Sequence, residues 1–457
     1  MTETAEPDAP FTYVDLFAGI GGFHAAMKSF GGRCEYAVEI DKDAAAIYKL
    51  NWGLDPRGDI TKVANDDVMT VPKSDVLLAG FPCQSFSKSG AQRGMDEARG
   101  TLFWNVARVI EGQKREDRPK VVILENVRNL VGPRHRHEWD VIIRTLRELG
   151  YRVSDDPSIM SPHWLPLEKG GRPQVRERVF ITATLLPEDV VDELPVLPAI
   201  RDRDLRGGEE WDLAADLPLD EDHHVNGCDL TDDERTWINA WDAWVRLMWD
   251  LVGDSPHARL PGHPVWVDAW VTNDKLRIPE DTPTWKRNFL VKNADLYTRH
   301  KAALDAWIKA YKVKSFPPSR RKFEWQAQQT RSLWECVMHL RPSGIRAKRP
   351  TYLPALVAIT QTSIVGSRER RISPREAARL QGLPDWYTFG DQSDAASYKQ
   401  LGNGVNVGVV AHVLRKHVER DEEILKITAP GLVDAVVNST YTSPDDALEA
   451  LGLTPAE

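Results

Sequence analysis

The chemistry open to this sequence centres on one thiol, which lies in the hexapeptide Gly-Phe-Pro-Cys-Gln-Ser at residues 80–85. Cys83 follows the apolar run at residues 75–79, which is typical of a buried strand. Glycine and proline fix the backbone before the cysteine, so the sulfur would be presented at the strand end as a nucleophile. The alternative is a small buried hydrophobe, the usual state of an intracellular cysteine. The rest of the chain favours the nucleophile.

A carboxylate follows a second apolar strand. Residues 120–124 (Lys-Val-Val-Ile-Leu) lead directly into Glu125. If this strand runs parallel to residues 75–79 in one sheet, Glu125 lies on the same rim as Cys83. A helix cap or a surface acid is the alternative, but a charge directly after buried positions has to be satisfied inside the fold. We therefore expect the thiol and the acid to face one pocket.

A third region has the pattern of a nucleotide cradle. Residues 11–17 are rich in β-formers and lead through Ala-Gly-Ile-Gly-Gly into a helical stretch at residues 23–30. Such glycines let a ligand approach the backbone, and the helix N-terminus offers free N–H groups. A second strand, residues 34–40, carries Glu39 about 20 residues after the turn, where ribose-binding acids occur. Gly58-Asp59-Ile60 is expected to end a third strand, with Asp59 accepting from an adenine amino group.

These regions must be positioned by an α/β fold. Further helices are expected at residues 42–50, 101–111 and 139–149, the last ending at Gly150, and a further strand at residues 178–182. Alternating strands and helices are typical of a doubly wound, mainly parallel sheet. The strand ends would then place all three regions along one edge of that sheet.

Composition excludes several classes of protein. The four cysteines show no paired short spacing, so neither a disulfide framework nor a metal site is expected. No apolar run reaches the about 20 residues that cross a bilayer, and residues 1–10 are acidic and polar, unlike a signal peptide. We therefore expect a cytoplasmic protein with no membrane partner.

The net charge of −9 hides a strong segregation of charge. Residues 188–235 hold 17 acids and four bases, whereas residues 285–350 hold 16 bases and four acids. Aromatic residues are interleaved with these bases, a combination that suits a nucleic-acid surface. A solvated basic face beside a tryptophan-rich core has the same composition, and Trp237, Trp241 and Trp244 recur at helical spacing as core residues do.

Six motifs occur in order along the chain. They are Asp-Leu-Phe-Ala-Gly-Ile-Gly-Gly-Phe at residues 15–23, the Pro-Cys segment at 80–87, Glu-Asn-Val at 125–127, Pro-Gln-Val-Arg-Glu-Arg at 173–178, and two C-terminal segments at 373–384 and 398–405. In this order they resemble the first, Pro-Cys, Glu-Asn-Val, Gln-x-Arg-x-Arg, ninth and tenth motifs of the bacterial cytosine-5 DNA methyltransferases. The resemblance implies the class I methyltransferase fold, which is Rossmann-like.

The resemblance also implies a mechanism. Cys83 would add to carbon 6 of cytosine as a thiolate, and Glu125 would hold the N3 edge of the base and supply a proton. Arg178, with Arg176, would bind the base carbonyl or a flanking phosphate. The cytosine would be rotated out of duplex DNA, and the loop at residues 87–100 would close over it.

The implied methyl donor is S-adenosylmethionine. The residues implied to bind this cofactor are Asp15, Phe17, Ala18, Gly19, Ile20, Gly21, Gly22, Glu39, Ile40, Asp59, Ile60, Pro82, Leu102, Asn403 and Val405. The candidate DNA contacts are Gln84, Ser85, Ser87, Arg93, Arg99, Gln174, Arg320, Arg321, Lys322, Arg346, Lys348 and Arg349.

The motifs divide the chain into segments. Residues 11–185 would form the first part of the catalytic domain, and residues 186–365 a smaller target-recognition domain that holds eleven of the 16 tryptophans. Residues 366–420 would carry the ninth and tenth motifs, and residues 421–457 a helical tail. The expected partners are double-stranded DNA and a cognate restriction endonuclease acting on the same site.

Three functions fit this pattern. The first is sequence-specific methylation of duplex DNA in a restriction-modification system, by a monomer located at the bacterial nucleoid when bound to DNA. The second is the tRNA-methylating branch of the family, which lacks a large recognition insert. The third is a non-catalytic DNA-binding protein on this scaffold, which the intact Cys83, Glu125 and Arg178 argue against.

Overall fold

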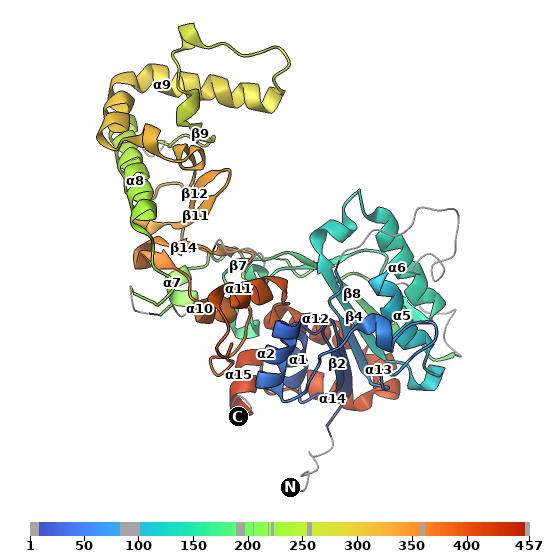
Figure 1. Cartoon of the computed structure of the whole chain (residues 1–457). Helices are drawn as coiled ribbons and strands as arrows, with labels where there is room; N and C mark the ends of the chain where they lie inside the picture. The colour runs from blue at the N-terminus through green and yellow to red at the C-terminus, as the bar shows by residue number, and fades with distance from the viewer. Residues whose placement is uncertain are drawn as a thin grey trace. The chain divides into compact units, whose positions relative to one another are not determined.

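The computed structural model of the chain describes residues 9–82, 101–188, 197–203, 205–217, 219–220, 224–253, 258–356 and 362–452 (Figure 1). It divides into two compact units. The first comprises Met1–Trp211, Pro354–Ala358 and Ala377–Glu457, and the second comprises Asp212–Leu353 and Ile359–Glu376. The main unit boundaries follow Trp211 and Leu353 and precede Ala377, whereas the division predicted at residues 186, 366 and 421 follows the motifs and stays a prediction.

The first unit is built on a mixed sheet. In the described part of the chain this sheet has seven strands in the order β2-β1-β3-β4-β8-β5, with β6 also paired to β8. The pairs among β2, β1, β3 and β4 are parallel, and β8 runs antiparallel to β4, β5 and β6. The strands are β1 (Thr12–Leu16), β2 (Arg33–Val38), β3 (Val76–Ala79), β4 (Val121–Val127), β5 (Tyr151–Val153), β6 (Ser158–Met160) and β8 (Arg178–Leu185).

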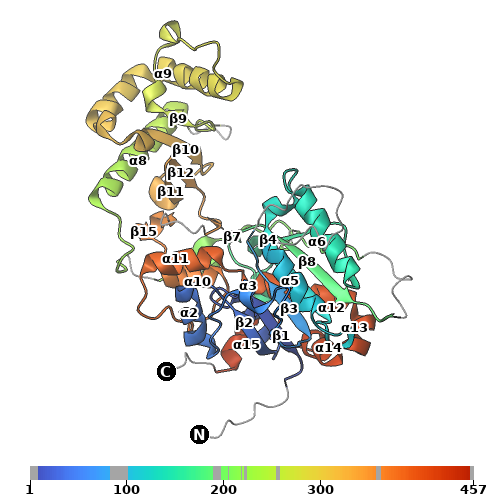
Figure 2. The same cartoon turned by 45° about the vertical axis from the view of Figure 1, so that its right-hand side comes forward.

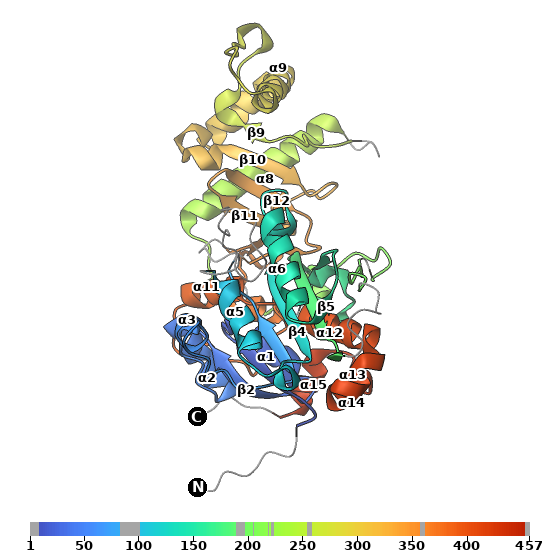
Figure 3. The same ribbon diagram turned by 90° about the vertical axis from the view of Figure 1, so that its right-hand side faces the viewer.

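Helices cover both faces of this sheet (Figures 2 and 3). Side chains that alternate along the strands, such as Val14, Leu16 and Leu77, join those of α5 and α6 in one apolar core. On the opposite face Tyr13 packs edge-on against His24 of α1, and His24 bonds to Tyr48 of α2. The doubly wound α/β fold class predicted from the sequence is therefore confirmed.

The helices of the first unit start where the sequence offers caps. Asp41 accepts from the amides of Asp43 and Ala44 at the start of α2, and Thr101 accepts from that of Trp104 at the start of α5. The helices are α1 (Gly22–Lys28), α2 (Lys42–Trp52), α3 (Ile60–Val63), α5 (Leu102–Glu111), α6 (Arg136–Glu148), α10 (Pro374–Leu380, shared with the second unit), α11 (Asp394–Asn403), α12 (Val407–Arg420), α13 (Glu422–Thr428), α14 (Pro430–Val437) and α15 (Pro444–Ala450).

The expected third strand end at residues 58–60 is wrong. Ile60 begins the short helix α3, because the carboxylate of Asp59 accepts from the amide and the hydroxyl of Thr61 and so caps a helical turn. Strand-like pairing there is limited to a single bridge between Glu39 and Arg57.

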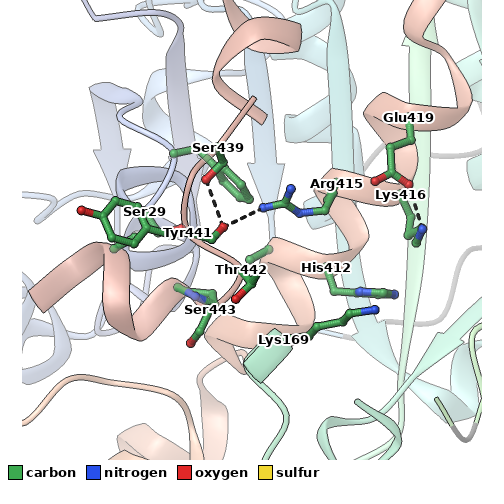
Figure 4. A pocket seen from close by; sticks show the side chains of 14 residues that line it. Ser29, Lys169, His412, Arg415, Lys416, Glu419, Ser439, Tyr441, Thr442 and Ser443 are labelled. Atoms are coloured by element: carbon green, nitrogen blue, oxygen red, sulfur yellow. Dashed lines mark hydrogen bonds and ion pairs between the residues drawn. The ribbon is translucent and has the colours of Figure 1, made fainter. Parts of the chain in front are cut away.

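The C-terminal helices pack onto the first unit. Asp445, in α15, forms an ion pair with Arg172, and α15 contacts both α1 and α12. A cavity of about 180 Å³ remains between α12 and residues 439–447. Figure 4 shows Arg415 reaching from α12 to the carbonyl of Tyr441, which also accepts from Ser439. None of the predicted site residues lines this cavity.

The second unit has its own core around a second sheet. Six strands pair in the order β15-β14-β11-β12-β10-β9 in the described residues. The tryptophans of α8 that were predicted as core lie there, and Trp241 stacks on Phe323 with 4.7 Å between ring centroids. The elements are α7 (Leu213–Asp216), α8 (Asp232–Val252), β9 (Val265–Trp266), α9 (Thr284–Ala310), β10 (Lys322–Gln326), β11 (Val337–Arg341), β12 (Gly344–Lys348), β14 (Ile364–Val365) and β15 (Arg370–Arg371).

The described residues offer neither a membrane span nor a cluster of metal ligands. No helix there combines the length and apolar character needed to span a membrane. No group of three or more histidine, cysteine, aspartate or glutamate side chains there is arranged to hold a metal ion.

Candidate active site

A cavity of about 540 Å³ opens at the C-terminal ends of β1, β2, β3 and β4 in the first unit. This edge of a parallel sheet is where open α/β folds bind their ligands, and the volume lies in the usual range for small-molecule sites. The lining residues are Phe17, Gly19, Val38, Glu39, Ile40, Gly58, Asp59, Ile60, Gly80, Phe81, Pro82, Leu102, Glu125, Asn126, Val127, Arg178, Gly402 and Asn403.

The glycine turn between β1 and α1 forms one end of this cavity. Gly19 and Gly21 have positive φ angles of 55° and 91°, a conformation that costs glycine little. A Cβ on Gly21 would lie 2.2 Å from Nε1 of Trp52, so the turn can approach this ring only without a side chain. Beside Gly19 the space is open, with no atom within 4 Å of a Cβ position. The backbone there is accessible to a ligand.

Glu39 faces the glycine turn from the end of β2. Its carboxylate accepts from the amide of Gly19 at 2.8 Å and from that of Asp41 at 2.7 Å. Burial raises the pKa of Glu39, and these two amides partly offset the effect. The side chain is thus held in one orientation at the cavity wall, where its remaining acceptor capacity can serve a ligand hydroxyl.

The far wall of this end mixes apolar and polar groups. Ile40 is 69% exposed and lines the cavity beside Ile60 and Leu102. Asp59 also lines it, and the pKa of Asp59 is lowered chiefly by the hydrogen bond from the Thr61 hydroxyl. Apolar flanks, a fixed acid and open glycine backbone suit a nucleoside, whose base is flat and apolar and whose ribose carries hydroxyl donors. The residues present therefore fit the nucleoside part of S-adenosylmethionine.

An ion pair marks the other end of the cavity. Glu125, at the end of β4, accepts from Nε of Arg178 at 3.0 Å. Burial raises the pKa of Glu125, and the positive charges of Arg178 and Arg176 partly offset that rise. A carboxyl group with a raised pKa beside a fixed cation can hold or release a proton against a bound base.

Asn126 connects this ion pair to the loop after β3. Its Nδ2 donates to the carbonyl of Phe81 at 2.9 Å, and its Oδ1 accepts from the amide of Val127. Phe81 lies two residues before Cys83 in the chain. Asn126 was not among the predicted site residues, although its place inside the Glu-Asn-Val motif was a usable signal.

Arg176 does not line the cavity. Its side chain is buried, and it donates to the carbonyls of Leu356 at 3.2 Å, Gly402 at 3.0 Å and Gly404 at 2.6 Å. Burial lowers the pKa of Arg176 to about 9, helped by repulsion from Arg178. Its guanidinium is therefore engaged by the main chain at the end of α11, next to the cavity residue Asn403.

The predicted cofactor residues fall into two groups. Nine line the cavity and six lie behind it. Asp15 is one of the six and is fully buried. Its pKa is raised chiefly by burial and secondly by repulsion from Glu39. Val405 packs against Gly22, because a Cβ added to Gly22 would lie 2.8 Å from Cγ2 of Val405. The lining group is Phe17, Gly19, Glu39, Ile40, Asp59, Ile60, Pro82, Leu102 and Asn403, and the group behind is Asp15, Ala18, Ile20, Gly21, Gly22 and Val405.

Several predicted residues lie outside the described part of the chain. They are the nucleophile Cys83 and the candidate DNA contacts Gln84, Ser85, Ser87, Arg93 and Arg99. Gln174 is described and is fully buried, so its side chain is not available to a duplex in this structure.

The predicted DNA contacts on the strands of the second unit are engaged within that unit. Arg320 donates to the carbonyls of Arg341 and Leu340, and Arg321 pairs with Asp268. Arg346 pairs with Glu324. Lys322 lies over the ring of Trp266, Lys348 lies over that of Tyr352, and Arg349 is partly buried.

Two aromatic residues that sequence reasoning missed hold the glycine turn. The hydroxyl of Tyr387 donates to the carbonyl of Ile20 at 2.7 Å, and Nε1 of Trp52 donates to the same carbonyl at 3.3 Å. Tyr387 follows α10, far from the turn in sequence, and no local pattern could have connected the two.

The chain is similar to several known proteins. Residues 11–419 match the family described as C-5 cytosine-specific DNA methylase. The chain is 49% identical to the Type II methyltransferase M.AluI of Cellulosimicrobium cellulans, covering 98% of this chain and 99% of that protein. It is 28% identical to M.HpaII of Haemophilus parainfluenzae over 90% of each. A crystal structure of S. pombe Dnmt2 methyltransferase aligns with 16% identity over 90% of this chain and 98% of that one, at a TM-score of 0.45.

Proposed function

The chain belongs to the C-5 cytosine-specific DNA methylases, and we propose that it methylates cytosine within one short sequence of duplex DNA, using S-adenosylmethionine. It is a DNA cytosine-5 methyltransferase. The observation that carries the proposal is the single cavity that joins the Gly19 and Glu39 end to the Glu125 and Arg178 ion pair. A methyl donor and a cytosine could meet in that cavity.

The donor would occupy the glycine end. Glu39 would accept from its ribose hydroxyls, while Ile40 and Ile60 would flank its base and Asp59 would accept from the exocyclic amine. When bound, the donor supplies an electrophilic methyl group. Asn403, held by the Arg176 contacts at the end of α11, would close the wall on the other side.

The cytosine would occupy the Glu125 end after rotation out of the duplex. The thiolate of Cys83 would form a bond to carbon 6, which places negative charge on the ring and makes carbon 5 nucleophilic. Glu125 would supply a proton to N3 as this charge builds, and Arg178 would bind the carbonyl oxygen of the base. Carbon 5 would then form a bond to the methyl group, which would leave its bonding electrons on the sulfur of the donor. A base would remove the carbon 5 proton, the electrons of that C–H bond would re-form the double bond to carbon 6 and expel the thiolate, and N3 would return its proton to Glu125.

We further propose that the enzyme protects DNA in a restriction-modification system. Its relatives M.AluI and M.HpaII are named Type II methyltransferases, and the match to M.AluI runs through both units. A cognate endonuclease acting on the same sequence is the partner that this role implies. The tRNA-methylating alternative is not favoured, because these relatives match the second unit as well as the first.

The experiment is sequencing of plasmid DNA from cells that express the full chain, by bisulfite conversion or nanopore. We expect methylated cytosines in one short sequence, and none in cells that express Glu125→Gln or Cys83→Ala. Unmethylated plasmid from well-expressed wild-type protein would contradict the proposal. Methylation that persists in Glu125→Gln would contradict the role given to that carboxyl group.

A further inference from the structure

The long helix α9 (Thr284–Ala310) carries an excess of positive charge that the second unit does not neutralise. Residues 284–314 hold eight bases and only two acids, Asp295 and Asp305. In the described residues Asp305 pairs with Lys301, and no ion pair engages Lys286, Lys292 or Arg299. The strand residues of the same unit show the opposite behaviour, because Arg321, Arg341 and Arg346 all have carboxylate partners.

The first third of α9 is also not held by the core. None of residues 284–292 is buried, and Trp285 exposes 59% of its surface. Buried positions begin only at Asn293, after which Ala294, Leu296, Leu304 and Trp307 anchor the helix. Figure 1 shows α9, drawn in yellow, at one end of the second unit beside β9. An exposed helical segment that keeps cations and a large ring at its surface is typical of a binding surface.

Two cations of α9 act on the same neighbouring side chain, His263. His263 faces both Lys292 and Arg299, and burial together with these two charges lowers its pKa. Lys292 and Arg299 are seven residues apart, which places them on the same side of the helix. From Lys292 to Arg299 the helix rises about 10 Å, which corresponds to about three base pairs of duplex DNA.

We infer that Lys292 and Arg299, the α9 cationic pair, bind the phosphate backbone of duplex DNA without reading its sequence. The inference rests on the proposed function, since it takes the DNA substrate as the polyanion, and it assigns the contact to a helix that contributes nothing to the catalytic cavity. Sequence-independent contacts of this kind supply affinity and position the protein, whereas base contacts supply specificity.

The test measures how salt weakens DNA binding. A labelled duplex without a recognition sequence is titrated with the full chain over a series of KCl concentrations, by fluorescence anisotropy. Each lost phosphate contact lowers the slope of log affinity against log salt by about 0.9, so the double variant Lys292→Gln, Arg299→Gln should lower it by about 1.8. Both positions are exposed, so the unfolding temperature should not change.

The control removes the same charge from exposed positions of the first unit with Lys114→Gln and Lys426→Gln, and its slope should equal that of the wild type. A wild-type slope in the α9 variant, or equal losses in both variants, would overturn the inference. The proposed function is tested separately by sequencing plasmid from the same strains. If the wild type methylates plasmid but the α9 variant has the wild-type salt slope, only the inference is refuted. If the wild type neither methylates plasmid nor binds the duplex, both the inference and the proposed function are refuted.

Discussion

Arg176 and Arg178 are two residues apart, and the structure predicts opposite consequences for their loss. Arg176 is buried and donates to three main-chain carbonyls, so Arg176→Gln leaves buried acceptors unsatisfied. Removing one partner from such a buried charged network costs about 3–5 kcal/mol, which lowers the unfolding temperature of a unit of about 300 residues by about 5–8 °C. Arg178 is partly exposed, and its buried partner Glu125 has a raised pKa and can take up a proton once the arginine is removed. Arg178→Gln should therefore cost less, about 1–3 kcal/mol.

The two substitutions should rank in the opposite order in their effect on kcat. Arg178→Gln removes a cation from the reacting base and should lower kcat at least about a hundredfold. Arg176→Gln, assayed well below its unfolding temperature, should mainly raise KM for the methyl donor, because the carbonyls it binds flank the cavity residue Asn403. Thermal unfolding followed by tryptophan fluorescence and steady-state methyl transfer measure the two effects. An Arg176→Gln protein as stable as the wild type but with a low kcat would refute this reasoning.

Three further predictions follow from single positions. Gly21→Ala should weaken donor binding at least about tenfold, because the added Cβ would collide with the Trp52 ring. The control is Gly53→Ala, which also has a positive φ but no atom within 4 Å of the added Cβ, and which should bind the donor as the wild type does. Equal donor binding by the two variants would contradict this prediction. Asn126→Leu removes the hydrogen bond to the Phe81 carbonyl and should lower kcat about tenfold with little change in KM for the donor. An unchanged kcat would contradict the connection between Asn126 and the loop after β3. His24 and His417 are buried, and burial lowers the pKa of each to about 3. Between pH 7.5 and pH 5.5 these two histidines gain protons only in the unfolded chain, so the free energy of unfolding measured with urea should be about 2–3 kcal/mol lower at pH 5.5. An equal free energy of unfolding at the two pH values would exclude this.

Local patterns predicted the groups that lie at strand ends. Glu39 was predicted because it ends a strand about 20 residues after the glycine turn, and Glu125 because it directly follows an apolar strand. The ends of parallel strands meet at one edge. Three residues at 58–60 could not distinguish a strand end from a helical turn. The Asp59 side chain decided the matter by capping α3.

Tertiary partners decided what local patterns could not. Arg176 and Arg178 belong to one short motif, yet the first binds main-chain carbonyls and the second binds Glu125, because β8 begins at Arg178 and turns the two side chains to different surroundings. The basic segment of the second unit posed the same problem. Its composition gave the excess of charge but not which cations the fold neutralises. Of the residues preferred from the sequence, Arg321 and Arg346 pair with carboxylates, Arg320 donates to main-chain carbonyls, and Lys322 and Lys348 lie over aromatic rings.

Glu125 shows why a catalytic carboxyl group is placed beside a cation inside a cavity. Burial favours the neutral form of the carboxyl group, which has a proton to give, but without a cation the carboxylate left after proton transfer would be unpaired inside the cavity. The Arg178 ion pair alone would keep the group ionised, with no proton to give. Burial raises the pKa of Glu125, and the charges of Arg178 and Arg176 partly offset that rise. Arg178 would also contact the base, so the negative charge that moves from the ring to Glu125 with proton transfer stays beside the same cation, and the transfer separates little charge.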